Sequence, residues 1–133
     1  MTFKLATLAT LGLAALAVTA PASAEQSKGD EQLAKLLEGR VAGEPTRCVP
    51  SHVNARIYMI DKTALVYDAG RTIYINYTAH PEALDSNDML VIRDATPSFC
   101  RTSRVEMRRS YASDSLGYPI FLTDFVPYKR ASD

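Results

Sequence analysis

The chain has 133 residues, and its 15 Lys and Arg residues balance 15 Asp and Glu residues. A formal net charge of zero at pH 7 creates no strong field for nucleic acid or an anionic membrane, which argues against both as partners. The sequence also contains no motif for phosphate binding, for a nucleophile elbow, for a kinase or for a zinc protease.

The first 24 residues have the three-part organisation of a secretory signal peptide, and their Ala-rich composition resembles that of bacterial examples. Lys4 supplies a positive charge, residues 5–20 form an apolar run, and residues 22–24 read Ala-Ser-Ala, a small-x-small cleavage pattern. The run is shorter than the about 20 residues that a membrane-spanning helix needs. We therefore expect cleavage after Ala24 and export to the periplasm or the cell exterior. Residues 25–133 would then form one domain without a membrane anchor.

The exported part is predicted to open with one short helix over "DEQLAKLLEGR". Asp30 suits the N-cap position, and Gly39 suits the position that follows a helix. Leu33, Leu36 and Leu37 form one apolar stripe. We expect this stripe to pack on a sheet, because a helix this short needs tertiary support.

Six later segments are rich in β-branched and aromatic residues and are separated by turn residues. These segments are residues 55–60, 63–68, 71–78, 89–94, 100–110 and 120–128. Pro127 in the last of them indicates the edge of a sheet. The sequence therefore predicts an α+β domain, with one short N-terminal helix and about six mostly antiparallel strands in a small curled sheet or barrel.

The register of the second and third predicted strands depends on the turn at residues 68–70. Ala-Gly suits neither of the preferred two-residue turns, whereas a three-residue loop places Gly70 in a left-handed conformation that glycine tolerates. That loop pairs Tyr67 with Arg71 and Leu65 with Ile73. The core face would then contain Leu65, Tyr67, Ile73, Ile75 and Tyr77, with Tyr74 on the opposite face.

Cys48 and Cys100 are the two cysteines of the chain, and an even pair in an exported protein predicts one disulfide. The alternative is a Cys₂His₂ zinc site completed by His52 and His80. Its spacing departs from the closely spaced ligand pairs of zinc sites, so we expect neither a metal nor another cofactor.

The loop that leads from Tyr111 to Tyr118 is the candidate binding site. Tyr111, Ser113, Asp114 and Tyr118 supply its aromatic and polar groups. Exposed loops on a rigid scaffold often carry binding residues, so we expect this loop to contact a protein or a small ligand.

Two other groups of residues suggest weaker alternatives. Arg101, Arg104, Arg108 and Arg109 would suit an anion, but a solvated strand face that protects a sheet edge explains them better. His52 and His80 have no partner at a spacing that indicates a catalytic triad, although triads are recognised by geometry and not by chain order.

The leading hypothesis is a non-enzymatic binding or interaction module braced by the disulfide. One alternative is a small hydrolase that uses His52 or His80 with a nearby carboxylate, which requires a concave pocket that holds the pair. Another is an enzyme inhibitor that presents residues 110–119 as a rigid loop.

Four stretches of the sequence together carry a resemblance. "GRVAGEPTRCV", "MIDKTALVYDAGRTIYIN", "SFCRTSRVEM" and "GYPIFLTDFVPYK" resemble a group of small exported bacterial proteins of unknown function. The resemblance covers nearly the whole exported part. It implies that the helix, the two cysteines and the β-meander belong to one domain type, and it carries over no activity and no catalytic residue.

Overall fold

The structure is a computed structural model that describes residues 22–94, 97–110 and 116–131, with side chains from residue 28 onward. Most of the predicted signal peptide lies outside these residues, so the cleavage site and the boundary of the exported domain stay predictions. No helix in the described part of the chain is long and apolar enough to cross a membrane.

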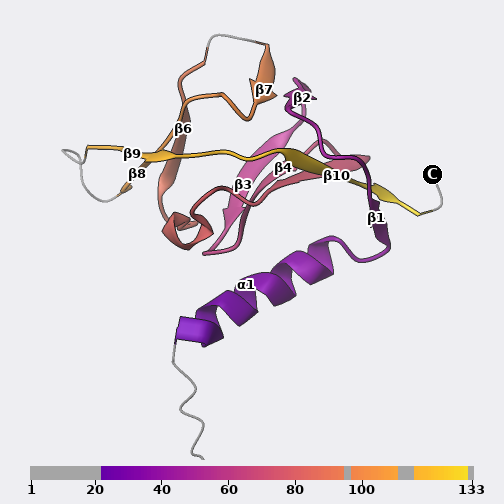
Figure 1. Cartoon of the computed structure of the whole chain (residues 1–133), viewed down its shortest axis with the longest axis horizontal. Helices are drawn as coiled ribbons and strands as arrows, with labels where there is room; N and C mark the ends of the chain where they lie inside the picture. Colours follow the sequence, from indigo (N-terminus) through magenta and orange to yellow (C-terminus); the bar gives the residue numbers. More distant parts are fainter. Residues whose placement is uncertain (1–21, 95–96, 111–115, 132–133) are drawn as a thin grey trace, which may run out of the picture.

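The described residues form one α-helix, one short 3₁₀ helix and ten strands (Figure 1). In chain order these are α1 (Ala22–Leu36), β1 (Arg40–Ala42), β2 (Cys48–Pro50), β3 (Arg56–Ile60), β4 (Ala64–Asp68), β5 (Thr72–Asn76), η1 (Pro81–Ala83), β6 (Met89–Ile92), β7 (Ser98–Cys100), β8 (Val105–Arg108), β9 (Tyr118–Ile120) and β10 (Phe125–Arg130).

The predicted α+β class is wrong, because the fold is largely β and its strands do not close into a barrel within the described residues. Three antiparallel sheets have the strand orders β1-β10-β5-β4-β3, β2-β7 and β6-β8-β9. Two predicted segments each contribute to two strands: residues 100–110 to β7 and β8, and residues 120–128 to β9 and β10. The short strands β1 and β2 were missed because three residues carry no readable alternation.

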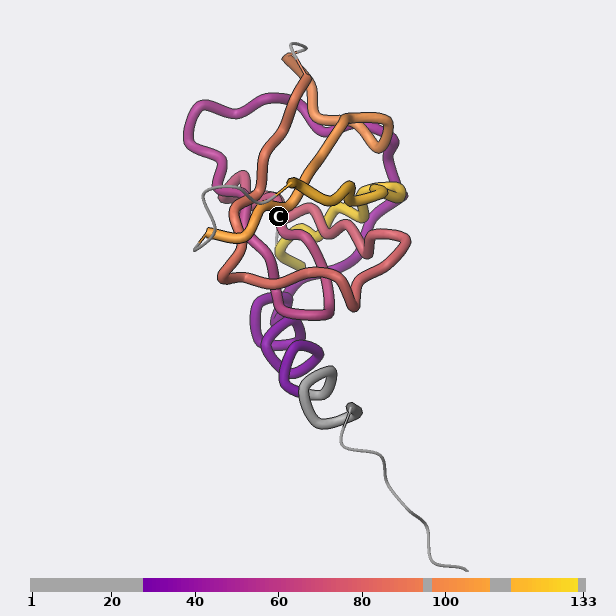
Figure 2. Tube along the Cα trace, turned by 90° about the vertical axis from the view of Figure 1, so that its left-hand side faces the viewer, coloured from indigo at the N-terminus to yellow at the C-terminus, as the bar shows by residue number. Residues whose placement is uncertain are grey.

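The five-stranded sheet separates two hydrophobic cores. One core lies between this sheet and the other two sheets, and it is built around Leu65, Tyr67, Phe99, Met107 and Phe125. The second core lies between the sheet and α1, and it joins Leu33 to Ile60, Ala64, Val66, Ile73 and Ile75. Figure 2 shows α1 beneath the strands, so the prediction that its leucine stripe packs on a sheet is confirmed.

The helix begins earlier than the sequence predicted. Because α1 starts at Ala22, Asp30 lies inside the helix and is not its N-cap. Gly39 has a φ of 72°, so the predicted left-handed residue after the helix is confirmed.

The predicted register between β4 and β5 is wrong. Tyr67 faces Tyr74 and Val66 faces Ile75, which leaves a two-residue loop in place of three. Gly70 still has the predicted positive φ, 87°. Its N–H is donated to Asp68 Oδ1 at 2.9 Å, and the Arg40 guanidinium donates to the Gly70 carbonyl oxygen at 3.4 Å. Ala69 pairs with Thr72, so the loop is Gly70-Arg71, and a turn with glycine at the first central position is one of the preferred two-residue turns.

The assignment of faces is corrected with the register. Ile73 and Ile75 lie in the helix-side core, whereas Leu65 and Tyr67 lie in the other core. Tyr77 is 41% exposed and belongs to neither core. The prediction placed one face of these strands in the core and the other outside it, whereas both faces of β4 and β5 are covered.

The position predicted for Pro127 is also wrong. Strand β10 lies between β1 and β5, so the proline sits inside the sheet and not at its edge. The Pro127 carbonyl oxygen accepts the Gly43 N–H at 2.7 Å, beyond the last residue of β1. The missing proline donor therefore falls where that ladder ends.

The predicted disulfide is confirmed. Strands β2 and β7 pair with Cys48 directly opposite Cys100, and the sulfur atoms are bonded at 2.03 Å. The bond is consistent with an oxidising compartment. It also rules out the zinc alternative in this structure, because neither sulfur is a thiolate.

The buried side-chain amide of Asn76, at the end of β5, is hydrogen-bonded to the segment that connects β9 to β10. Asn76 is fully buried, and its side chain donates to the Thr123 carbonyl oxygen at 2.7 Å. Asn76 Oδ1 accepts the Thr123 N–H at 3.0 Å. These bonds fix the chain where it passes from β9 to β10.

We predict that removal of the disulfide by a Cys48→Ser, Cys100→Ser double substitution lowers the free energy of unfolding by about 4 kcal/mol. The bridge spans 52 residues, and a loop of that size restricts the unfolded chain strongly. Urea unfolding of both proteins measures the difference. An equal midpoint for the two proteins would contradict the expected stabilisation.

We predict that Asn76→Ala costs about 1–3 kcal/mol, because it leaves the partly buried Thr123 backbone groups without their side-chain partner. Asn54→Ala is the control, since Asn54 is exposed and its loss should cost less than about 0.5 kcal/mol. Urea unfolding again gives both values. Similar costs for the two variants would show that the buried amide is dispensable.

Candidate functional site

Two hollows lie at opposite ends of the boundary between strands β3 and β6, which we call the seam. Each of these strands is the edge of its sheet. At one end Ile57 of β3 and Ile92 of β6 line the same hollow. At the other end the Lys62 N–H is donated to the Leu84 carbonyl oxygen at 3.0 Å, just beyond β3 and before β6. The start of β3 thus lies near the end of β6, and the two edges run antiparallel across the seam.

The larger hollow, which we call the groove, has a volume of about 790 Å³. It brings together the side of α1, the β3–β4 turn, η1, the residues before β6, and one residue each from β9 and the end of β8. Its lining residues are Lys28, Gly29, Gln32, Asp61, Lys62, Glu82, Ala83, Leu84, Asp85, Asn87, Asp88, Arg109 and Tyr118.

Local structure places the groove's polar groups. The Asp85 carboxylate accepts the Asn87 N–H at 2.9 Å, a short turn that shapes the segment before β6. Asp61 Oδ1 accepts the Ser86 N–H and joins this segment to the β3–β4 turn. A Cβ atom on Gly29 would overlap the Thr63 hydroxyl, so glycine lets α1 approach that turn closely.

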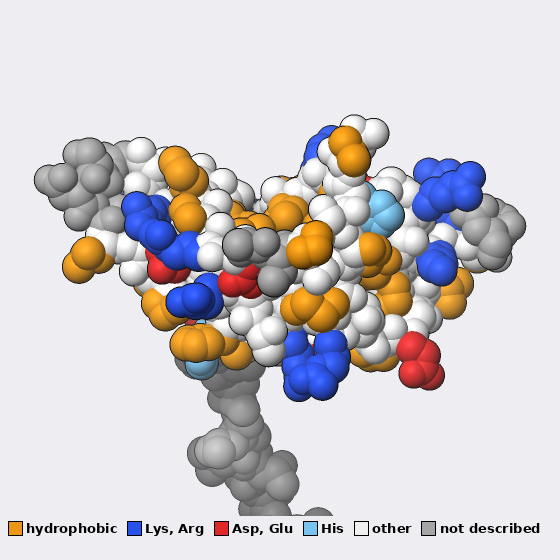
Figure 3. All heavy atoms as spheres, turned by 90° about the horizontal axis from the view of Figure 1, so that it is seen from above, with side chains coloured by type: hydrophobic (Ala, Val, Ile, Leu, Met, Phe, Trp, Pro, Cys, Tyr) orange, Lys and Arg blue, Asp and Glu red, His pale blue; other side chains and the backbone are white. Residues whose placement is uncertain are grey.

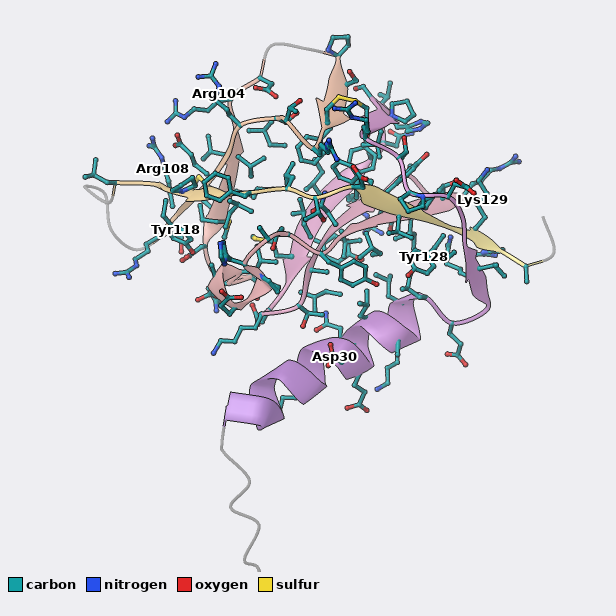
Figure 4. The ribbon with its side chains drawn as sticks, in the orientation of Figure 1. Asp30, Arg104, Arg108, Tyr118, Tyr128 and Lys129 are labelled. Carbon is teal, nitrogen blue, oxygen red and sulfur yellow. A yellow bond between two sulfur atoms is a disulfide. The ribbon has the colours of Figure 1, made fainter. Side chains whose placement is uncertain are left out.

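Tyr118 is the predicted site residue that the structure places in the groove (Figure 4). Its hydroxyl lies 2.9 Å from Asp88 Oδ2 and 3.1 Å from the Ala83 carbonyl oxygen, so both acceptors favour the protonated phenol. Burial, followed by the hydrogen bond to Asp88, raises the pKa of Tyr118 to about 12. Tyr111, Ser113 and Asp114 lie outside the described residues, so the rest of the predicted binding loop stays a prediction.

The groove carries charges of both signs. Four carboxylates line it, from Asp61, Glu82, Asp85 and Asp88, together with the cations of Lys28, Lys62 and Arg109. The sequence pattern predicts Tyr118 as a site residue and Arg109 as part of a weaker alternative, but it does not indicate the carboxylates. They lie in turns whose polar residues are common in any connection, so only the tertiary structure shows that they converge.

The smaller hollow has a volume of about 230 Å³ and lies at the open end of the seam. Its apolar wall comes from Ala55, Ile57, Tyr67, Ile92, Pro97 and Phe99. Ser51, His52, Asp94, Ser98 and Ser103 supply polar groups around it. Figure 3 looks down on this end and shows hydrophobic side chains in the depression between two lobes.

Hydrogen bonds hold two groups of the smaller hollow in place. The Tyr67 hydroxyl donates to the Pro50 carbonyl oxygen at 2.9 Å and accepts the His52 N–H at 3.1 Å. Hydrogen bonds from the Ser103 side chain and the Arg104 backbone lower the pKa of Asp94 below its usual value. Asp94 is therefore a carboxylate at neutral pH.

Neither histidine meets the geometric requirement for the hydrolase alternative. His52 lines the smaller hollow with Asp94, but its imidazole forms no ion pair with that carboxylate in the described residues. His80 Nδ1 lies 3.3 Å from Glu82 Oε1, yet the two side chains are 69% and 71% exposed. His80 does not line the groove. Glu82 lines the groove, but its histidine partner is exposed outside that lining, so no histidine–carboxylate pair lies within a described pocket.

The arginines of β8 and its neighbours form an exposed, paired surface. Arg101 contacts Asp124 at 3.0 Å, and Arg108 shares Glu106 with Arg93. Figure 4 shows Arg104 and Arg108 at the outer side of the sheet. These pairs favour a solvated face over an anion site, but β8 lies between β6 and β9, so the prediction that the arginines protect a sheet edge is wrong. No group of three His, Cys, Asp or Glu side chains in the described ranges is arranged to hold a metal ion.

Comparisons of the chain with protein-family models, with curated proteins and with solved structures give no match. The resemblance to small exported bacterial proteins therefore stays a prediction from the sequence.

We predict that Tyr118→Phe removes one of the tyrosines that ionise near pH 12 in an ultraviolet absorbance titration. Asp88→Asn should lower the pKa of Tyr118, because it removes the negative charge beside the phenol. Tyr77→Phe is the control that assigns the signal, because the pKa of Tyr77 is also raised to about 12 and this variant should leave the titration of Tyr118 in place.

The raised pKa of Tyr118 makes the stability of the folded protein depend on pH. The folded protein keeps the Tyr118 proton that the unfolded chain loses near pH 10. The contribution of this proton to stability is therefore complete below pH 10 and is lost as the pH rises toward 12. A titration of Tyr118 at its ordinary pKa would contradict the hydrogen-bonded geometry.

Proposed function

We propose that the protein is an exported, disulfide-braced binding module whose groove takes a small polar ligand with charged groups of both signs. The observation that carries this proposal is the convergence of several chain segments on one hollow of about 790 Å³. That volume lies within the range of about 300–1,000 Å³ that ligand sites usually have.

The groove's chemistry favours a zwitterionic ligand, such as a short peptide with free ends. Asp85 and Asp88 offer carboxylates to an ammonium group, and Lys28 on α1 offers an ammonium group to a carboxylate. Ala83 and the Tyr118 ring, which are partly buried, add apolar surface to the lining. Because the charges nearly balance, the groove would select a pattern of charge and not a single sign.

The proposal of export draws on two independent features. The first 24 residues have the organisation of a signal peptide, and the disulfide suits an oxidising compartment. The inhibitor alternative needs a rigid loop within residues 110–119, and much of that loop lies outside the described residues. The groove, in contrast, is formed by residues that the structure describes.

We predict that short peptides with free ends shift the amide NMR signals of Asp85, Asn87 and Asp88. The probes are pools of tripeptides, added to the oxidised protein without its first 24 residues. Gln32→Trp should weaken binding by more than about tenfold, because a large ring on α1 would fill the groove. Ala34→Trp is the matched control, since Ala34 is exposed on the same helix but does not line the groove.

Two results would refute the proposed groove site. In the first, no tripeptide pool shifts the groove amides of the folded protein. In the second, Gln32→Trp binds the same pool as tightly as Ala34→Trp does.

A further inference from the structure

We propose that the seam between β3 and β6 is a second binding site, which takes one extended peptide strand of a partner protein. The peptide would pair with both edges and place an apolar side chain in the smaller hollow. This inference does not depend on a ligand in the groove. It follows from the unpaired backbone groups of the two edges and from the side chains between them.

The free edge of β3 offers the backbone groups of Ile57 and Met59. The Ala69 N–H is donated to the Thr72 carbonyl oxygen at 3.0 Å, which continues the ladder between β4 and β5. Antiparallel ladders alternate, so every second residue of β4 bonds to β5 and the others bond to β3. By this alternation Arg56, Tyr58 and Ile60 point toward β4. Ile57 and Met59 point away from it, with no other backbone partner in the described residues.

The free edge of β6 offers the backbone groups of Leu90 and Ile92. The Arg93 N–H is donated to the Arg104 carbonyl oxygen at 2.9 Å, which extends the ladder between β6 and β8. The same alternation then turns Leu90 and Ile92 outward. No hydrogen bond to these outward groups is present over the described ranges of the chain. Each edge therefore presents donors and acceptors at every second residue, which is the pattern that an extended backbone matches.

Side chains along the seam are incompletely covered. Ile92 shares its face of the sheet with Val105, which is buried, yet Ile92 itself is 38% exposed. Ile57 packs against the same core and is only partly buried. Both line the smaller hollow, whose deeper wall includes Phe99 and Tyr67. An inserted strand would cover these isoleucines and direct one apolar side chain into the hollow.

The seam requires a single extended segment and not a second copy of this sheet. A strand that pairs with β3 on one side and with β6 on the other must itself have two free edges. In a second copy, β3 is already paired with β4, and β6 is already paired with β8. Either strand would satisfy one edge of the seam and leave the other unpaired.

Charge narrows the chemistry of the partner. Asp94 is the carboxylate that lines the smaller hollow, and its lowered pKa keeps it ionised. A Lys or Arg on the inserted strand would pair with it. The partner segment is therefore an extended peptide in which apolar residues alternate with polar ones, with a basic residue near the open end of the seam.

The test uses capped peptides of about six residues in which valine alternates with lysine or with glutamate. Peptides are titrated into the oxidised protein without its first 24 residues, and amide signals and hydrogen exchange are followed by NMR. We expect the lysine peptide to protect the amides of Ile57, Met59, Leu90 and Ile92. It should bind about threefold more tightly than the glutamate peptide, and Asp94→Asn should remove that preference.

A matched pair of variants on β6 distinguishes peptide binding at the seam from nonspecific hydrophobic binding. Ile92→Thr should weaken binding about tenfold, because Ile92 faces the hollow. Met89→Thr should leave binding unchanged, since Met89 is exposed on the same strand but does not line the hollow. Gln32→Trp, which fills the groove, should also leave peptide binding at the seam unchanged, so the proposals for the two sites are tested independently.

Three results would overturn the inference. The first is the absence of protection at all four edge amides with both peptides. The second is equal binding by the Ile92→Thr and Met89→Thr variants. The third is protection of the same amides in the protein alone as its concentration rises, which would assign the seam to a second copy of the chain.

Discussion

Strand β4 is buried on both faces, and the rest of the fold is arranged around that burial. Ala64 and Val66 contact the core that α1 covers, whereas Leu65 and Tyr67 contact the core shared with the smaller sheets. A strand of this kind needs a layer on each side. The leucines of α1 form one layer and the sheets of β2-β7 and β6-β8-β9 form the other. The large sheet thus has no solvent-facing side at its centre, although it is antiparallel.

Covering both faces leaves the edges as the part of the sheet that is still open. On one side the chain joins the two sheets directly, because it runs from β9 of the three-stranded sheet into β10 of the five-stranded sheet. The Asn76 side chain is hydrogen-bonded to this connection at Thr123. On the other side β3 and β6 are not paired along their lengths in the described residues, although contacts near Lys62 and Leu84 join the chain at one end. The seam is the result, with the groove at its joined end and the smaller hollow at its open end. The Cys48–Cys100 bond holds β2 to β7 beside the open end.

The two hollows differ in chemistry because different elements border them. Turns and a helix side border the groove, and turns are rich in Asp, Asn and Lys, so the groove is polar and charged. Strand faces border the smaller hollow, and these supply Ile57, Ile92 and Phe99. One domain therefore offers two surfaces of different character. His52 lines the smaller hollow, whereas His80 pairs with Glu82 of the groove but does not itself line that groove.

The sequence by itself determined the features that depend on local chemistry. The two cysteines specified their bond, the leucine stripe of α1 specified its buried face, and Gly70 and Gly39 specified left-handed residues. The central strands were also readable from β-branched and aromatic residues. The register of β4 and β5 was not, because alternation identifies a register only when one face is buried, and here both faces are. The carboxylates of the groove and the open seam likewise depend on which distant segments meet. Their positions follow from strand order and from contacts such as that of Asp61 with the Ser86 N–H, and only the tertiary structure decides these.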